Sequence, residues 1–132
     1  DAAAFPNAVI YINKIEYDSW ISMDGNGRLQ MIADAYDGRI VTFMPEDSLP
    51  CGIKAVAAYG HTPGHTLYLI GDILIAGDIM HGVALQREHP EFCARFDMDS
   101  DAAVNSRRAV LQMASEGNLK VYGMHFPAPY HL

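Results

Sequence analysis

The chain has 132 residues, half of them hydrophobic, and a formal net charge of −7. This length suits a single domain covering residues 1–132, and the apolar content is enough for a globular core. The sequence has no long run of lysine or arginine, which argues against a nucleic-acid surface and favours a small-molecule partner. The longest apolar runs, 67–70 and 73–76, are too short to cross a membrane.

The N-terminal segment has no basic region followed by a long apolar core, so we expect no signal peptide within this chain. The alternative that a leader was removed earlier stays open, so the sequence does not define the localisation. Cys51 and Cys93 are far apart and form neither a CxxC pair nor a zinc-ribbon spacing. We interpret both as ordinary small residues, with a disulfide as the alternative.

The first half of the chain is predicted to mix short strands and helices. A continuous β-rich run is typical of a strand, and apolar residues at helical spacing indicate a helix. The Asp24-Gly25-Asn26-Gly27 cluster is predicted to be a turn. On these patterns the elements in chain order are a strand at 8–13, a helix at 14–21, a helix at 28–36, a strand at 39–44, a polar loop at 45–52 and a strand at 53–59.

The second half contains a hairpin signal, because the β runs 66–70 and 73–76 are separated only by Gly71 and Asp72. Residues 78–97 are rich in His, Pro and charge and are predicted to be an irregular functional loop. Ser100 is the predicted N-cap of a long helix that ends at Gly117. A last short strand is predicted at 119–123, followed by a tail.

Three polar residues follow or precede predicted strands. Pro63 and Gly64 restrict and bend the loop so that His65 can be aimed rigidly at the start of a strand. Asp78 follows an apolar strand and a glycine, and one aspartate can bridge two cations through its two oxygens. His125 follows the last strand. Each pattern alone is more often a surface residue or a turn, but together they indicate a metal site.

Three sequence motifs resemble those of the metallo-β-lactamase superfamily in kind and order. They are His61-Thr62-Pro63-Gly64-His65-Thr66, the Gly77-Asp78 pair and the late His125. The resemblance implies an α+β fold, part of an αββα sandwich in which a mixed β-sheet is flanked by helices. It also implies a zinc site, dinuclear in the family, with iron and manganese as alternatives.

The resemblance assigns roles to single residues. His65 would bind the first metal ion, His125 the second, and Asp78 would bridge the pair and be the catalytic residue. His61 would contact the metal ligands without binding a metal ion itself. His81 and Arg107 would line the substrate pocket, although an arginine on a helix is more often solvated or in a salt bridge.

The family's principal metal motif, HxHxDH, occurs nowhere in this sequence. We therefore expect the chain to be the C-terminal portion of the fold, with a partial metal site or none. The parent reaction would be hydroxide attack on an ester, lactone or amide, and the isolated chain is expected to be inactive. The alternatives are a catalytically inert association module and a metal-binding module without turnover. Exposed apolar surface predicts a homo-oligomer or an exchange of elements between copies.

Overall fold

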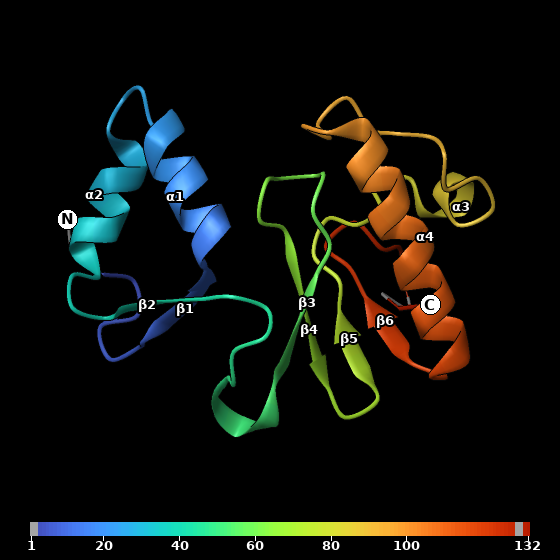
Figure 1. Cartoon of the computed structure of the whole chain (residues 1–132), viewed down its shortest axis with the longest axis horizontal. Helices are drawn as coiled ribbons and strands as arrows, with labels where there is room; N and C mark the ends of the chain where they lie inside the picture. Colours follow the sequence, from blue (N-terminus) through green and yellow to red (C-terminus); the bar gives the residue numbers. More distant parts are fainter. Residues whose placement is uncertain (1–2, 129–130) are drawn as a thin grey trace. The chain divides into compact units, whose positions relative to one another are not determined.

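The computed structural model describes residues 3–128 and 131–132 of the chain. The chain divides into two compact units, Asp1–Met44 and Pro45–Leu132. Each unit has its own β-sheet and its own helices (Figure 1). The sheets contain both parallel and antiparallel pairs, which confirms the predicted α+β class with mixed sheets.

The first unit is a parallel strand pair joined by two helices. Strand β1 (Ile10–Asn13) pairs in parallel with β2 (Ile40–Phe43), and α1 (Lys14–Met23) and α2 (Arg28–Ala35) form the connection. The buried Asn13 ends the strand and caps the helix, because its side chain accepts a hydrogen bond from the backbone N–H of Ile15. Helix α1 continues two residues beyond its predicted end and stops at Met23, directly before the turn-forming cluster.

The second unit is built on a four-stranded sheet. The strands are β3 (Lys54–Ala57), β4 (Thr66–Ile70), β5 (Ile73–Ile75) and β6 (Lys120–Tyr122), in that order across the sheet. Strands β3, β4 and β5 are antiparallel neighbours, whereas β5 and β6 are parallel. The predicted hairpin is present, with Gly71 at a φ of 61° in its turn.

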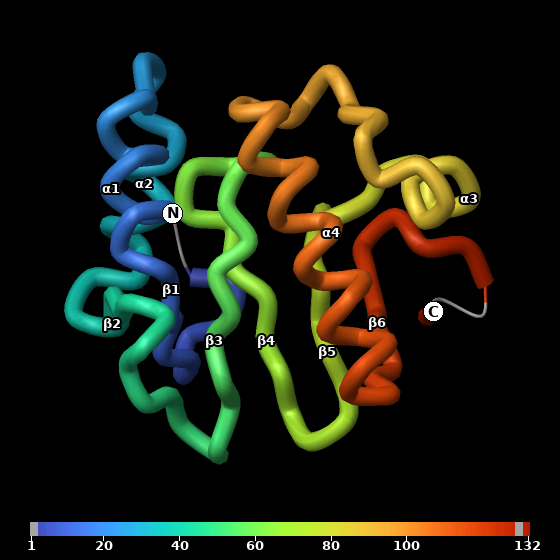
Figure 2. Tube along the Cα trace, turned by 45° about the vertical axis from the view of Figure 1, so that its right-hand side comes forward, coloured from blue at the N-terminus to red at the C-terminus, as the bar shows by residue number. Residues whose placement is uncertain are grey.

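Helix α4 (Ser100–Glu116) runs alongside the strands of this sheet, as Figures 1 and 2 both show. Its Val110 is buried in the same core as Leu67 and Leu74 of the sheet. Val121 of β6 and Phe126, just beyond that strand, complete the cluster. The core of the second unit therefore holds the ends of β4, β5 and β6 in fixed positions.

The structure corrects three local predictions. The N-cap of α4 is Asp99 rather than Ser100, because the Asp99 carboxylate accepts a hydrogen bond from the N–H of Ala102. The segment 78–97, predicted to be irregular, contains the short helix α3 (Val83–Gln86). The buried Gln86 stabilises the start of α3, since its side-chain oxygen accepts from the N–H groups of His81 and Gly82. A 3₁₀ turn, Pro50–Gly52, lies in the predicted loop before β3.

Cys51 and Cys93 are both free and exposed, so the disulfide considered as an alternative is not formed in the structure. Among the described residues, no helix combines the length and the apolar character that a membrane span requires.

Candidate functional site

The candidate site lies in the second unit, where several strands end at one edge of the sheet. Because β5 and β6 are parallel, the residues after them emerge at the same edge, and antiparallel β4 begins there. A hydrogen bond of 3.0 Å from the N–H of Met124 to the carbonyl of Gly77 ties the two strand ends together. As a result, Nε2 of His125 is 3.4 Å from Oδ1 of Asp78.

His65, at the start of β4, is held from both sides of its ring. Its Nδ1 is 3.1 Å from the carbonyl oxygen of Ala58, and its Nε2 accepts a hydrogen bond of 3.1 Å from the N–H of Asp78. A Cβ atom at Gly77 would lie 2.8 Å from Nε2 of His65, and Gly77 has a φ of +51°. Only glycine allows this approach without strain.

His61 lies between two carboxylates. Its Nε2 is 3.4 Å from Oδ2 of Asp78, and its Nδ1 is 3.1 Å from Oδ1 of Asp97. The Asp97 side chain is completely buried. Asp97 is not among the site residues predicted from the sequence. The contact with His61, 36 residues away in the chain, had no signal in the local sequence.

His61, His81 and His125 form a histidine cluster, in which His81 lies between the other two. Its ring centroid is 4.8 Å from that of His61 and 4.6 Å from that of His125. Burial lowers the pKa of His81 below its ordinary value, and the nearby charges of His61 and His125 lower this pKa further. The cluster therefore favours a neutral imidazole at this position, which is the form that binds metals.

Three buried side-chain atoms at this edge have no hydrogen-bond partner among the described residues, namely Oδ1 of Asp78, Nδ1 of His81 and Oγ1 of Thr62. Ligand atoms of Asp78, His81 and His125 lie within 4.8 Å of one another, as do those of His61, His81 and Asp97. Imidazole and carboxylate donors suit zinc, and also iron and manganese. The donor set and its unpartnered atoms therefore fit a divalent metal ion.

The structure thus brings together four of the residues named from the sequence: His61, Asp78, His81 and His125. His65 contacts this group through the backbone of Asp78 and belongs to neither of the two ligand groups within the described residues. Arg107 does not face an open pocket. It is buried under the loop, where its guanidinium donates to the carbonyls of Ile79, Pro90 and Phe92 and to the carboxylate of Asp97.

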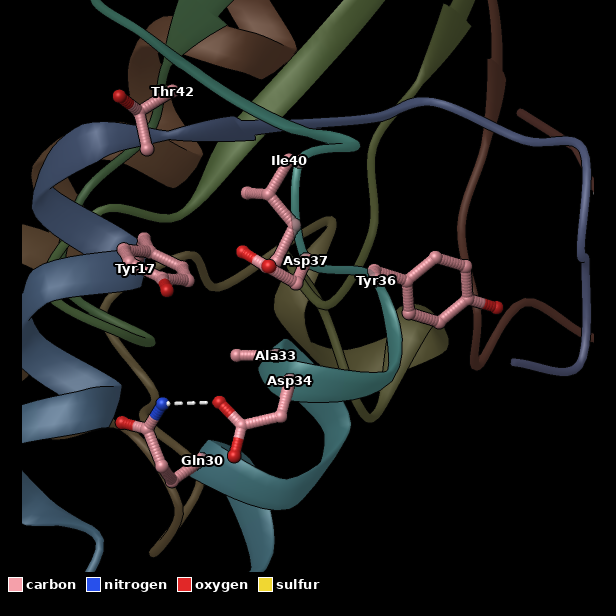
Figure 3. A pocket seen from close by; sticks show the side chains of 9 residues that line it. Tyr17, Gln30, Ala33, Asp34, Tyr36, Asp37, Ile40 and Thr42 are labelled. Atoms are coloured by element: carbon pink, nitrogen blue, oxygen red, sulfur yellow. Dashed lines mark hydrogen bonds between the residues drawn. The ribbon is translucent and has the colours of Figure 1, made fainter. Parts of the chain in front are cut away.

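The first unit has a hollow of a different kind, shown in Figure 3. Its volume is about 260 Å³, and Gln30 donates a hydrogen bond of 2.8 Å to Asp34 at its edge. The lining includes Tyr17 and Asp37 but no histidine or cysteine. Its chemistry is therefore less suited to a transition metal than that of the histidine cluster.

No protein-family model matches the sequence, and no curated protein matches it significantly. Solved structures do match. They are hydrolases of the metallo-β-lactamase superfamily, they cover nearly the whole chain, and the chain shares their fold.

One matching structure is AidC, a dizinc quorum-quenching lactonase in complex with a product, N-hexanoyl-L-homoserine. It is 28% identical with a TM-score of 0.82, over 96% of this chain and 51% of that protein. A second is the hydrolase AbOPH of the β-lactamase superfamily, 27% identical with a TM-score of 0.81, over 96% of this chain and 50% of that protein. A probable metal-dependent hydrolase from Staphylococcus aureus, 21% identical with a TM-score of 0.72, shares the fold over 98% of this chain and 47% of its own length. The chain therefore spans about half the length of the proteins that it matches.

Proposed function

We propose that the chain carries part of the metal centre of a metal-dependent hydrolase that acts on a small molecule with a lactone, ester or amide bond. The observation that carries this proposal is the convergence of Asp78, His81 and His125, whose ligand atoms lie within 4.8 Å of one another. Two of these residues, Asp78 and His81, offer buried atoms without hydrogen-bond partners in the described part of the chain. The lactonase with its bound product among the similar structures supports a lactone as the substrate class.

Asp78, His81, His125 and His65 would hold zinc in this proposal. When bound, a divalent cation would supply Lewis-acid activation of water and of a carbonyl oxygen. Asp78 is suited to bridging, because its two oxygens face different histidines, Oδ1 toward His125 and Oδ2 toward His61. His65 would join the ligands by exchanging the N–H of Asp78 for the cation at its Nε2.

The sequence lacks the HxHxDH motif that provides most metal ligands in the family. We therefore expect the 132-residue chain to bind zinc but not to turn over lactones or β-lactams by itself. Lactone hydrolysis by this chain that disappears with a chelator would contradict the second expectation. An inert association module is the remaining alternative, and it predicts no zinc.

The test is the zinc content of the purified chain by elemental analysis. We expect near-stoichiometric zinc, lost or strongly reduced in Asp78→Asn, His125→Ala and His65→Ala. Asp72→Asn and His89→Ala are matched controls, because both side chains are exposed and outside the cluster. A chain without zinc after exposure to a slight excess of the metal would refute the proposed metal centre.

We also expect the chain to form a homo-oligomer or to exchange elements between copies. Large apolar side chains are exposed in both units, among them Phe5 at 68% and Met124 at 76%. Contiguous apolar exposure favours association in water. Size-exclusion chromatography with light scattering measures the state directly, and a monomer at micromolar concentration would contradict this expectation.

A further inference from the structure

A chain of polar contacts runs from the interior of the second unit to the candidate site. Arg107 Nη2 is 3.3 Å from Oδ2 of Asp97, and Oδ1 of Asp97 is 3.1 Å from Nδ1 of His61. Nε2 of His61 in turn is 3.4 Å from Oδ2 of Asp78. The exposed fraction of the side chains rises along this series of contacts. It is 1% for Arg107 and 0% for Asp97, and it reaches 14% for His61 and 34% for Asp78.

We propose that Asp97 is a positioning residue of the histidine cluster, which accepts the Nδ1–H of His61 and so holds the His61 ring with its Nε2 toward Asp78. The proposal extends the proposed function, since it names a residue that acts on the metal ligand Asp78 through His61. Its claim about the proton of His61 concerns the metal-free chain and does not depend on that function.

The location of the proton follows from comparing the two carboxylates that flank His61. Asp97 is closer, at 3.1 Å against 3.4 Å for Asp78, and its side chain is fully buried. A charge-assisted hydrogen bond is stronger in a medium of low dielectric constant than at a wet surface. His61 therefore donates a hydrogen bond to Asp97 from Nδ1.

Asp97 is not itself suited to be a metal ligand, although its oxygen lies within reach of His61 and His81. Its Oδ2 already accepts from Arg107 and from the N–H of Ala94, and its Oδ1 faces His61. A cation on this carboxylate would stand close to the buried guanidinium of Arg107 and be repelled by it. These contacts of Asp97 support a role in which Asp97 acts on the site through His61.

Arg107 fixes the carboxylate from the other side. It also donates to the carbonyls of Ile79, Pro90 and Phe92, so the same side chain connects the segment after β5 with the loop that carries Asp97. The buried guanidinium of Arg107 therefore fixes the position of Asp97 relative to His61.

The first experiment is a long-range proton–nitrogen spectrum of the histidine side chains at pH 8, on the metal-free, nitrogen-15-labelled chain. We expect a proton on Nδ1 of His61 in the unsubstituted chain, and a changed Nδ1–H signal in Asp97→Asn. A His61 ring without a proton on Nδ1 in the unsubstituted chain would overturn the proposal. This spectrum needs no variant, so it decides even if Asp97→Asn fails to fold.

The second experiment is a double-mutant cycle on zinc affinity, measured by competition with a chelator. Loss of a group in the hydrogen-bonded shell around the metal ligands typically weakens metal binding by about 10- to 100-fold. We expect such a loss in Asp97→Asn, and no further loss when Asp97→Asn is added to His61→Gln. An equal loss in both backgrounds would mean that Asp97 acts as a ligand or through the fold, and would overturn the proposal. If the unsubstituted chain binds no zinc, the proposed function fails, and the spectrum alone decides the role of Asp97.

Discussion

The backbone N–H of Asp78 donates a hydrogen bond of 3.1 Å to Nε2 of His65, which lies thirteen residues earlier in the chain. This contact requires a lone pair on Nε2, so the proton of the neutral ring is on Nδ1, where the carbonyl of Ala58 accepts it at 3.1 Å. Metal-binding histidines commonly donate their second ring nitrogen to a backbone carbonyl in this way. The loop before β4 therefore presents His65 in the protonation state that a ligand needs.

Gly77 makes the contact between His65 and Asp78 possible, and Gly77→Ala should remove it. The new Cβ would lie 2.8 Å from Nε2 of His65, in a backbone conformation with a φ of +51°. We expect a loss of about 1–2 kcal/mol from the left-handed backbone and a further loss of about 1–3 kcal/mol from overpacking. Urea denaturation measures the free energy of unfolding, and a displaced His65 signal in the spectrum would accompany the loss.

Gly71→Ala is the matched control for this substitution. Gly71 has a similar φ of +61°, but a Cβ there would meet nothing within 4 Å. It should show the backbone loss alone and leave His65 unchanged. Equal losses in the two variants would mean that the approach of Gly77 to His65 has no steric consequence.

Arg107→Met should be among the most destabilising substitutions in the second unit. Arg107 is 1% exposed, and its removal leaves the buried carboxylate of Asp97 without its guanidinium partner. Breaking a buried ion pair from one side typically costs about 3–5 kcal/mol. Arg108→Ala is the control, because the neighbouring Arg108 is exposed and should change the free energy of unfolding by less than about 0.5 kcal/mol. A similar urea midpoint for both variants would show that the buried network does not stabilise the unit.

Much of the fold could be predicted because its elements follow from local patterns. The β runs on both sides of Gly71 and Asp72 predicted the hairpin of β4 and β5, and the apolar stripe after residue 100 predicted α4. The meeting of Asp78 and His125 could be anticipated as well, because strand ends of one sheet share an edge. Each of these inferences needs only the period of the sequence and the geometry of a sheet.

The contacts that join distant segments could not be predicted in the same way. The pairing of His61 with Asp97 depends on the path of the loop between β5 and α4, which has no periodic pattern. The burial of Arg107 has the same cause, because three of its acceptors are backbone carbonyls, which every residue carries. Side-chain identity indicates such a contact only when the partner is unusual, and a carbonyl group is not.

The N-cap of α4 is Asp99, one residue before the predicted Ser100. Asp99 accepts a hydrogen bond of 3.0 Å from the N–H of Ala102, and its φ and ψ of −129° and 101° are extended. Asp99→Ala should therefore lower the free energy of unfolding by about 1 kcal/mol. Ser100→Ala should have little effect, because Ser100 is already inside the helix. A larger loss for Ser100→Ala, measured by urea denaturation, would restore Ser100 as the cap.

The stability of the metal-free chain should fall in mild acid because of His81. Burial and the charges of His61 and His125 lower its pKa, and the carboxylates of Asp78 and Asp97 oppose this shift without cancelling it. Below the ordinary histidine pKa of about 6.5, the unfolded chain therefore binds a proton that the folded chain does not. The stability is complete above that pH and declines as the pH falls toward the lowered pKa of folded His81.

Urea midpoints at pH 7.5 and 5.5, with a chelator present, measure this decline. We expect His81→Gln to lose less stability between the two pH values than the unsubstituted chain, because the titrating group is gone. His89→Gln should behave like the unsubstituted chain, since His89 is exposed beside Glu91 and outside the cluster. Because all three chains share the same carboxylates, their general acid sensitivity cancels in the comparison. An equal decline in His81→Gln and in the unsubstituted chain would show that the neutral form of His81 is not favoured by folding.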